Sequence, residues 1–178
     1  ALIKTGAEND CEMSIIKAAD NANKQQRQNF INKIIKRFGE NLSGKTFAVW
    51  GLAFKPKTND MREAPAITII NELLSRGAKI KGYDPKAFDC ARFYFRDTIE
   101  YSTSAYEALS GADALLLLTE WNEFRRPDFE KVKQLLKQPI IFDGRNQFDN
   151  IRMNDKGFEY FCIGKTTQEN KYAAAGVL

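Results

Sequence analysis

The sequence contains no histidine, which removes a large part of known catalytic chemistry. Without an imidazole, the chain by itself cannot build the Ser/His or Cys/His pair that activates many nucleophiles. Its three cysteines, Cys11, Cys90 and Cys162, are widely spaced and form no Cys-x-x-Cys motif. The spacing indicates neither a disulfide framework nor a zinc site, and all three are expected to be packing residues.

Long apolar runs and clusters of basic residues are also missing. The longest apolar run, Ala114 to Leu118, is far shorter than the roughly 20 residues of a membrane span and predicts a buried strand. The net charge is +4, and the Lys and Arg residues are scattered along the chain. We therefore expect no membrane or nucleic-acid partner, although a small acidic ligand remains compatible. With neither disulfides nor a signal peptide indicated, a cytoplasmic location is the simplest expectation.

The 178 residues suffice for one full core with a helical extension. Apolar residues recur at helical spacing from Glu12 to Phe38, which predicts one long helix that ends at Gly39. The middle of this segment, NKQQRQN at 23–29, is polar on all sides. It is most simply a solvated turn of helix, and the alternative is a polar contact with another domain or subunit.

After residue 44, apolar strand-like runs alternate with helical patterns. This alternation predicts an α/β fold: a Rossmann-like, mainly parallel six-stranded sheet with helices on both faces, preceded by the long helix. The predicted strands are 46–52, 78–85, 99–101, 112–119, 139–143 and 158–164, and the helices between them are 65–76, 104–109 and 128–137.

Ligands of such sheets bind beyond the carboxyl ends of the strands, which directs attention to the loops after Gly51, Thr119 and Asp143. The loop after Gly51 begins like the first turn of a Rossmann unit. It lacks the GxGxxG fingerprint, because Ala53 and Phe54 stand where the second glycine would be. A dinucleotide bound in the usual way is therefore disfavoured.

The same loop offers a positive charge beside a helix N-terminus. Lys55 precedes the helix that begins at Pro65, and free amides there attract anions. The pair suits a phosphate-bearing ligand, although Lys55 could equally be a surface lysine. Arg62 lies between acidic residues in DMRE, where a surface ion-pair cluster is the simpler interpretation.

Three further polar positions follow predicted strands. Arg145 comes directly after a buried strand and Gly144, and its planar guanidinium suits phosphate, carboxylate or sugar hydroxyls. Asp84 stands where a Rossmann acid would meet a ribose, but a turn role before Pro85 is preferred. The TEW segment, 119–121, is interpreted only as the start of a helix.

Several motifs occur together and in order: GLAFKPKTNDMREAP, GYDP, GADALLLLTEW, DGRN and GFEYFCIG, after ALIKT and NKQQ near the start. As a set, over about residues 1–165, they resemble the UDP-glucose/GDP-mannose dehydrogenase family, and within it the UDP-glucose 6-dehydrogenases. In that family an N-terminal Rossmann domain binds NAD, a long central helix forms the dimer core, and a C-terminal domain holds the UDP half of the substrate.

The resemblance implies a central dimerisation helix region at 1–39, a UDP-sugar-binding Rossmann-like domain at 44–165 and a flexible tail at 166–178. It implies a homodimer as the assembly. The chain opens without a start Met, so it is expected to be a fragment whose partner is the N-terminal NAD domain of the same enzyme.

The resemblance also assigns roles to individual residues. Phe54 and Lys55 match the substrate-contacting pair of the family, and Arg145 matches an arginine that reaches the substrate from the partner subunit. Arg62 matches an arginine that lies against NAD. Ala64 departs from the pattern, since many members have a Ser there that would cap the helix.

The family carries out two successive NAD-dependent oxidations of a sugar C6 alcohol to the acid through a thiol-bound intermediate. Its nucleophilic cysteine lies in a loop that should precede Ala1, so no catalytic residue is expected in this chain and the chain alone should be inactive. NAD should bind mainly to the absent N-terminal domain. Open alternatives are the corresponding part of a UDP-N-acetylmannosamine or GDP-mannose dehydrogenase, and a stand-alone nucleotide-sugar-binding module.

Overall fold

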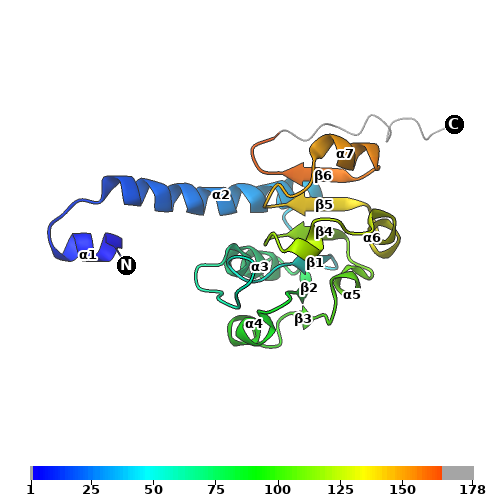
Figure 1. The fold of residues 1–178 in the computed structure, drawn as a ribbon, viewed down its shortest axis with the longest axis horizontal. Coiled ribbons are helices and arrows are strands. Elements are labelled where there is room, and N and C mark those ends of the chain that lie inside the picture. The colour runs from blue at the N-terminus through cyan, green and yellow to red at the C-terminus, as the bar shows by residue number, and fades with distance from the viewer. Residues whose placement is uncertain (1, 166–178) are drawn as a thin grey trace.

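Six parallel strands form one sheet in the order β3-β2-β1-β4-β5-β6 (Figure 1). The computed structural model describes residues 2–165. The chain builds outward from β1 to one edge and then from β4 to the other, which is the doubly wound Rossmann order. The predicted six-stranded sheet is confirmed. The strands are β1 (Thr46–Trp50), β2 (Lys79–Tyr83), β3 (Glu100–Tyr101), β4 (Ala114–Leu117), β5 (Ile140–Asp143) and β6 (Glu159–Cys162).

Helices cover both faces of the sheet, as predicted. Helices α2, α3 and α4 contribute buried side chains to the core on one face, and α5, α6 and α7 contribute to the core on the other. The helices are α1 (Leu2–Glu8), α2 (Ser14–Phe38), α3 (Pro65–Ser75), α4 (Phe88–Phe95), α5 (Ala105–Leu109), α6 (Phe129–Leu135) and α7 (Asn150–Asp155), with a short 3-10 helix η1 (Asn122–Phe124).

The central strands are buried on both faces, which explains their continuous apolar runs. In β1, Phe47 and Val49 point into the core beneath α2 and α3, whereas Ala48 and Trp50 point into the opposite core. All four are fully buried. Because the central strands are packed on both faces, they hold the loops at the ends of the strands in fixed positions.

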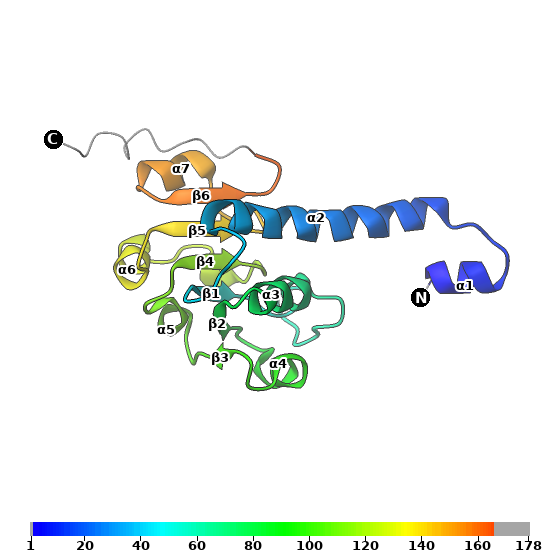
Figure 2. The same cartoon turned by 180° about the vertical axis from the view of Figure 1, so that it is seen from behind.

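Helix α2 belongs to the domain at one end and projects from it at the other (Figures 1 and 2). Its C-terminal half buries Phe30, Ile31 and Ile34 against the sheet. Its N-terminal half extends beyond the sheet and carries Ile15 with 85% of its surface exposed. The predicted long helix is confirmed, with its start at Ser14 rather than Glu12. The predicted flexible tail, 166–178, lies outside the described residues.

Helix α4 was not predicted from the sequence. Its residues FDCARFYF are rich in aromatics, which are weak helix formers. The structure nevertheless needs a crossover between the parallel strands β2 and β3, and a helix supplies it. Ala91 and Phe95 are buried at helical spacing, and that periodicity was the available signal. Helices α1 and α7 were missed as well. Among the described helices, none combines the length and apolar character that crossing a membrane requires.

We predict that Gly51→Ala lowers the free energy of unfolding by at least about 2 kcal/mol, because two penalties combine. Gly51 has φ +89°, and an added Cβ would lie only 2.7 Å from the backbone N of Thr119. Gly44 has φ +80° but nothing within 4 Å of the corresponding position, so Gly44→Ala is a matched control that should lose only about 1 kcal/mol. Urea denaturation measures both, and equal losses would contradict the close-approach argument.

Candidate functional site

The loops at the carboxyl edge of the sheet converge on the buried carboxylate of Asp84. Its Oδ2 accepts hydrogen bonds from the backbone amides of Leu52 and Ala53 at 2.8 and 3.0 Å, and from the indole N–H of Trp121 at 3.2 Å. Asp84 follows β2, the two amides follow β1, and Trp121 follows β4. One carboxylate thus joins three strand ends.

The other oxygen of Asp84 organises its own turn. Oδ1 accepts hydrogen bonds from the amides of Lys86 and Ala87 at 2.9 and 2.8 Å. The predicted turn role before Pro85 is therefore confirmed. Turn formation is only part of what Asp84 does, because its second oxygen links the turn to the β1 loop.

The β1 loop does not fit the pyrophosphate of a dinucleotide bound in the usual Rossmann manner. The amides of Leu52 and Ala53 already donate to Asp84, and the amide of Phe54 donates to the carbonyl of Asp60 at 2.9 Å. A Rossmann loop binds pyrophosphate through free amides at this position. In this chain an internal anion uses those donors, so the residues do not fit NAD at this strand end.

A cleft of about 320 Å³ opens between α2, the start of α3 and the ends of β4 and β5. Phe54 and Arg145, predicted from distant parts of the sequence, both line it. Phe54 is 47% exposed, which leaves its ring accessible. The structure therefore brings these two residues together within a single chain, and a contribution of Arg145 to a partner subunit stays a prediction.

Arg145 is held at the cleft by acidic groups on each side. Its backbone amide donates to Asp143 Oδ1 at 2.8 Å, and its side-chain Nε forms an ion pair with the carboxylate of Glu120. The hydrogen bond from Arg145 keeps the pKa of Glu120 below its usual value. Asp143 is itself fully buried and accepts a hydrogen bond from the hydroxyl of Tyr160 at 2.7 Å. The arginine therefore emerges from a rigid base.

The TEW segment does more than start a helix. A 3-10 helix does begin at Asn122, as expected for that segment. In addition, the Thr119 hydroxyl donates to the carbonyl of Ala53 at 2.6 Å, and Glu120 holds Arg145. With Trp121 bound to Asp84, all three TEW side chains tie the β4 loop to its neighbours.

Neither Lys55 nor Arg62 is among the residues that line this cleft. Lys55 is exposed and does not line it. Arg62 lines a separate hollow of about 510 Å³ beside α4, together with Phe93 and Tyr94. The structure thus separates Arg62 from Phe54 and Arg145, and its predicted contact with NAD stays a prediction.

The interpretation of Arg62 as a surface ion pair is confirmed. Its guanidinium donates to both carboxylate oxygens of Asp60, with Nη2 at 2.7 Å from Oδ2, while its side chain stays 84% exposed. Chiefly through these hydrogen bonds, Arg62 lowers the pKa of Asp60 to about 2. The Asp60 carboxylate therefore stays ionised, and paired with Arg62, at pH values between about 2 and 3.8, where an ordinary aspartate would be mostly protonated.

Sequence reasoning missed three polar residues of α2 that line the cleft, Asn23, Gln26 and Arg27. They lie on the helical face that continues to Phe30, the first of the buried residues of α2. The helical spacing of 23, 26, 27 and 30 is visible in the sequence. All residues of 23–29 are polar, however, so the sequence does not indicate which face of the helix turns toward the sheet.

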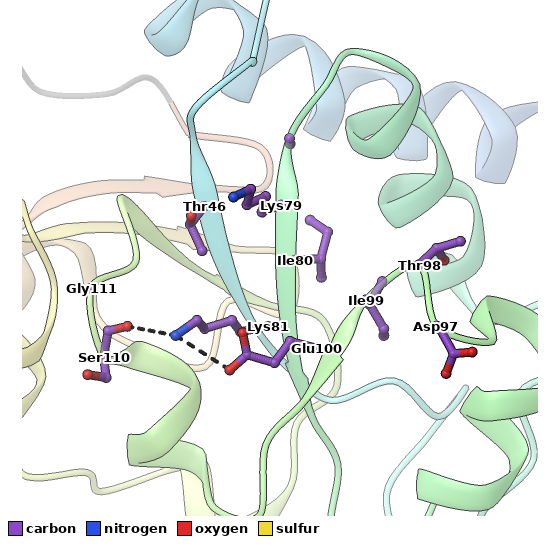
Figure 3. Close-up of a pocket in the computed structure, with 11 residues that line it drawn as sticks. Thr46, Lys79, Ile80, Lys81, Asp97, Thr98, Ile99, Glu100, Ser110 and Gly111 are labelled. Atoms are coloured by element: carbon purple, nitrogen blue, oxygen red, sulfur yellow. Dashed lines mark hydrogen bonds and ion pairs between the residues drawn. The ribbon is translucent and has the colours of Figure 1, made fainter.

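Another hollow, of about 620 Å³, lies at the opposite, amino edge of the sheet (Figure 3). Lys81 crosses it, donating to the carbonyl of Ser110 at 3.0 Å and pairing with Glu100 at 3.5 Å. Lys81 thus has protein partners, and Lys79 also lines the hollow. This edge carries none of the predicted site residues.

The cysteines differ in their surroundings. Cys162 is buried and Cys90 is half-buried, as expected of packing residues, but Cys11 is exposed. That expectation was wrong for Cys11 because this residue lies in the connection between α1 and α2, outside the core. Burial raises the pKa of the Cys162 thiol, which disfavours the reactive thiolate. Within residues 2–165, no group of acidic or thiol side chains is arranged to hold a metal ion.

A doubly wound parallel sheet with a basic and apolar cleft at its carboxyl edge defines a Rossmann-like ligand-binding domain. Residues 48–150 match the UDP-glucose/GDP-mannose dehydrogenase family, UDP binding domain. The chain belongs to this family, as the sequence motifs indicated.

Two enzymes are similar to the chain over 93% of its length. It is 41% identical over 165 residues to the UDP-glucose 6-dehydrogenase TuaD of Bacillus subtilis, and 36% identical over 176 residues to the UDP-glucose 6-dehydrogenase of Pseudomonas aeruginosa. It spans only 36% and 38% of those two proteins.

Among solved structures, a UDP-glucose dehydrogenase from Pyrobaculum islandicum superimposes with a TM-score of 0.70 at 30% identity, over 82% of this chain and 32% of that one. An NDP-N-acetyl-D-galactosaminuronic acid dehydrogenase from Methanosarcina mazei Go1 superimposes with a TM-score of 0.64 at 26% identity, over 78% of this chain and 28% of that one. The chain therefore corresponds to about a third of these enzymes.

We predict that Asp84→Ala lowers the free energy of unfolding by about 3 kcal/mol, because it leaves buried donors of Leu52, Ala53 and Trp121 without an acceptor. Asp60→Ala is the control, since it removes one partner of a surface ion pair and should lower the unfolding midpoint much less than Asp84→Ala does. Guanidinium denaturation followed by tryptophan fluorescence measures both. A midpoint for Asp84→Ala equal to that of the parent would contradict the anchoring role.

Proposed function

We propose that the chain is the nucleotide-sugar-binding and dimerisation part of an NAD-dependent UDP-glucose 6-dehydrogenase, which converts UDP-glucose and two NAD to UDP-glucuronate. The observation that carries this proposal is the meeting of Phe54 and Arg145 in one cleft at the carboxyl edge. Both residues match substrate-contacting positions of the family, and the cleft lies where ligands of doubly wound sheets bind.

The chemistry of the cleft suits a nucleotide sugar. Its lining includes the apolar side chains of Ile69 and Leu118 and the two arginines, Arg27 and Arg145. No Asp or Glu is among the described residues that line it. Two positive groups favour phosphate, and an apolar wall favours a sugar or base that turns a face away from water.

NAD is proposed to bind mainly outside this chain. The amides of Leu52, Ala53 and Phe54, where a Rossmann loop would bind pyrophosphate, are already bonded within the protein, so the chain supplies at most a contact such as Arg62. Hydride transfer needs a fixed nicotinamide, and the second oxidation needs an activated thiolate. We therefore infer that the chain alone does not oxidise UDP-glucose, and that an N-terminal NAD domain of the same enzyme completes the site.

UDP-glucose is preferred over UDP-N-acetylmannosamine and GDP-mannose as the substrate. The relatives at 41% and 36% identity are UDP-glucose 6-dehydrogenases. The motif KTNDMREAP also favours this assignment. The match over 93% of the chain with only about a third of each relative supports a part of a larger enzyme over a stand-alone binding module.

We predict that Arg145→Ala weakens UDP-glucose binding by about 1.5–3 kcal/mol, the value of a lost charged hydrogen bond. Lys55→Ala should act in the same direction through the loss of a nearby charge. Arg152→Ala, an exposed arginine of α7, is the charge-matched control and should bind as the parent does. Isothermal titration calorimetry gives the three affinities. Parental affinity in both Arg145→Ala and Lys55→Ala would refute the site assignment.

A second prediction concerns dimerisation through α2. Its N-terminal half exposes Ile15, and a charge buried in an apolar interface is costly, so Ile15→Asp should shift the dimer towards monomer at least tenfold in dissociation constant. Ser14→Asp adds the same charge one residue away at the helix start, where it is tolerated. Sedimentation equilibrium measures both variants. A strictly monomeric parent at high concentration, or equal effects of the two variants, would count against this interface.

A further inference from the structure

One face of the polar middle of α2 lines the cleft, with Asn23 and Gln26 exposed and Arg27 half-buried. Asn23, Gln26 and Arg27 line the cleft, and Phe30, one turn further, begins the stripe buried against the sheet. Positions three, four and seven apart lie on one side of a helix. The face that enters the core at Phe30 therefore continues outward as one wall of the ligand cleft.

Neighbouring polar residues of α2 bond along the helix. Gln25 Nε2 donates to Asn29 Oδ1 at 3.1 Å, and Gln28 Nε2 donates to Asn32 Oδ1 at 3.0 Å. The side-chain amide of Asn23, in contrast, has no hydrogen-bond partner within residues 2–165. Gln26, which also lines the cleft, accepts from Asn29 Nδ2 at 3.5 Å, so Asn23 is the cleft-lining amide of this segment that is left without a partner in the described part of the chain.

Arg27 is fixed at the N-terminus of α3. Its Nη2 donates to the carbonyl of Glu63 at 2.9 Å, and Glu63 lies just before the helix begins at Pro65. The N-cap residue Ala64 offers no side-chain cap, so the first turn of α3 keeps its positive end. A guanidinium and a helix N-terminus beside each other form a site of positive potential.

The two arginines of the cleft share one arrangement. Arg27 is held by a single bond to a carbonyl, and the side chain of Arg145 is held through its Nε by Glu120. Guanidinium groups have five N–H donors. Within the described part of the chain, the remaining donors of both have no protein acceptor. Each arginine is therefore positioned and still able to bind an anion.

We propose that Arg27 is a ligand-binding residue of this cleft that contacts the phosphate groups of the nucleotide sugar, with Asn23 beside it as a further hydrogen-bonding group. The inference rests on the proposed function and adds a residue of the helix to a site otherwise built from the sheet loops. Charge-assisted hydrogen bonds from a planar guanidinium match phosphate oxygens, and the α3 N-terminus favours the same charge. Ligand binding and the position of α2 are then coupled through one side chain.

The test is calorimetric titration of the 178-residue chain with UDP. Arg27→Ala should weaken UDP binding at least tenfold. Arg27→Gln keeps a side-chain N–H donor but removes the charge, so it should lose most of the same affinity. The matched control is Arg37→Ala, also on α2. Arg37 does not line the cleft, and its Nε lies 2.7 Å from Glu159 Oε1. Its loss should leave UDP affinity unchanged.

Titration with uridine distinguishes a contact between Arg27 and phosphate from a purely structural role of Arg27. Because uridine has no phosphate, its affinity, followed by NMR titration, should be the same in the parent and in Arg27→Ala. Parental UDP affinity in Arg27→Ala overturns the proposal. So does an equal loss of uridine and UDP affinity accompanied by a lower melting temperature, since that result would assign Arg27 to the attachment of α2 alone.

Inorganic pyrophosphate separates this inference from the proposed function. The parent chain could bind pyrophosphate in a way that depends on Arg27 and yet bind neither UDP nor UDP-glucose. That result would support the anion site and refute the nucleotide-sugar function. UDP-glucose binding that is sensitive to Arg145→Ala and insensitive to Arg27→Ala would retain the function and refute the role of Arg27. A parent that binds neither pyrophosphate nor UDP refutes both.

Discussion

The buried carboxylate of Asp84 is the constraint on which the ligand edge of this domain depends. It accepts hydrogen bonds from the loop after β1, from its own turn after β2 and from the indole of Trp121 after β4. A buried ionised group is tolerated only when its hydrogen-bonding capacity is filled, and five donors fill it here. Those donors are then no longer free for a ligand. The domain thus has the strand order of a dinucleotide-binding domain, but the Asp84 carboxylate occupies the amides that would usually bind phosphate.

With that site closed, the proposed ligand site lies further out, in the cleft between α2 and the start of α3. This location gives the long helix two roles along one face: Phe30 and Ile34 fix it to the sheet, and Arg27 lies over the cleft. The cleft-lining residues and the projecting half belong to one continuous helix, Ser14–Phe38. The binding site and the proposed dimer contact are therefore parts of one rigid element.

Local patterns in the sequence identified most of the fold, because buried parallel strands read as apolar runs and Pro65 and Gly77 delimit α3. They failed at α4, where aromatic residues weaken the helical signal and the need for a crossover decides the structure. At the site, Arg145 was predictable because it directly follows a buried strand. Arg27 was not, because its environment is set by a loop 36 residues away at Glu63, and no local pattern records such a contact.

Most of the motif that begins at Gly51 holds the backbone of the β1 loop in place. Gly51 is required because Thr119 packs against its backbone, and Thr119 in turn donates to the carbonyl of Ala53. These contacts, together with Asp84, hold the loop so that Phe54, the next residue, is left exposed at the cleft. Most of the motif therefore serves to fix the backbone, and its effect on the ligand is indirect. The positive groups of the proposed anion site are Arg27 and Arg145, which come from different elements, α2 and the loop after β5.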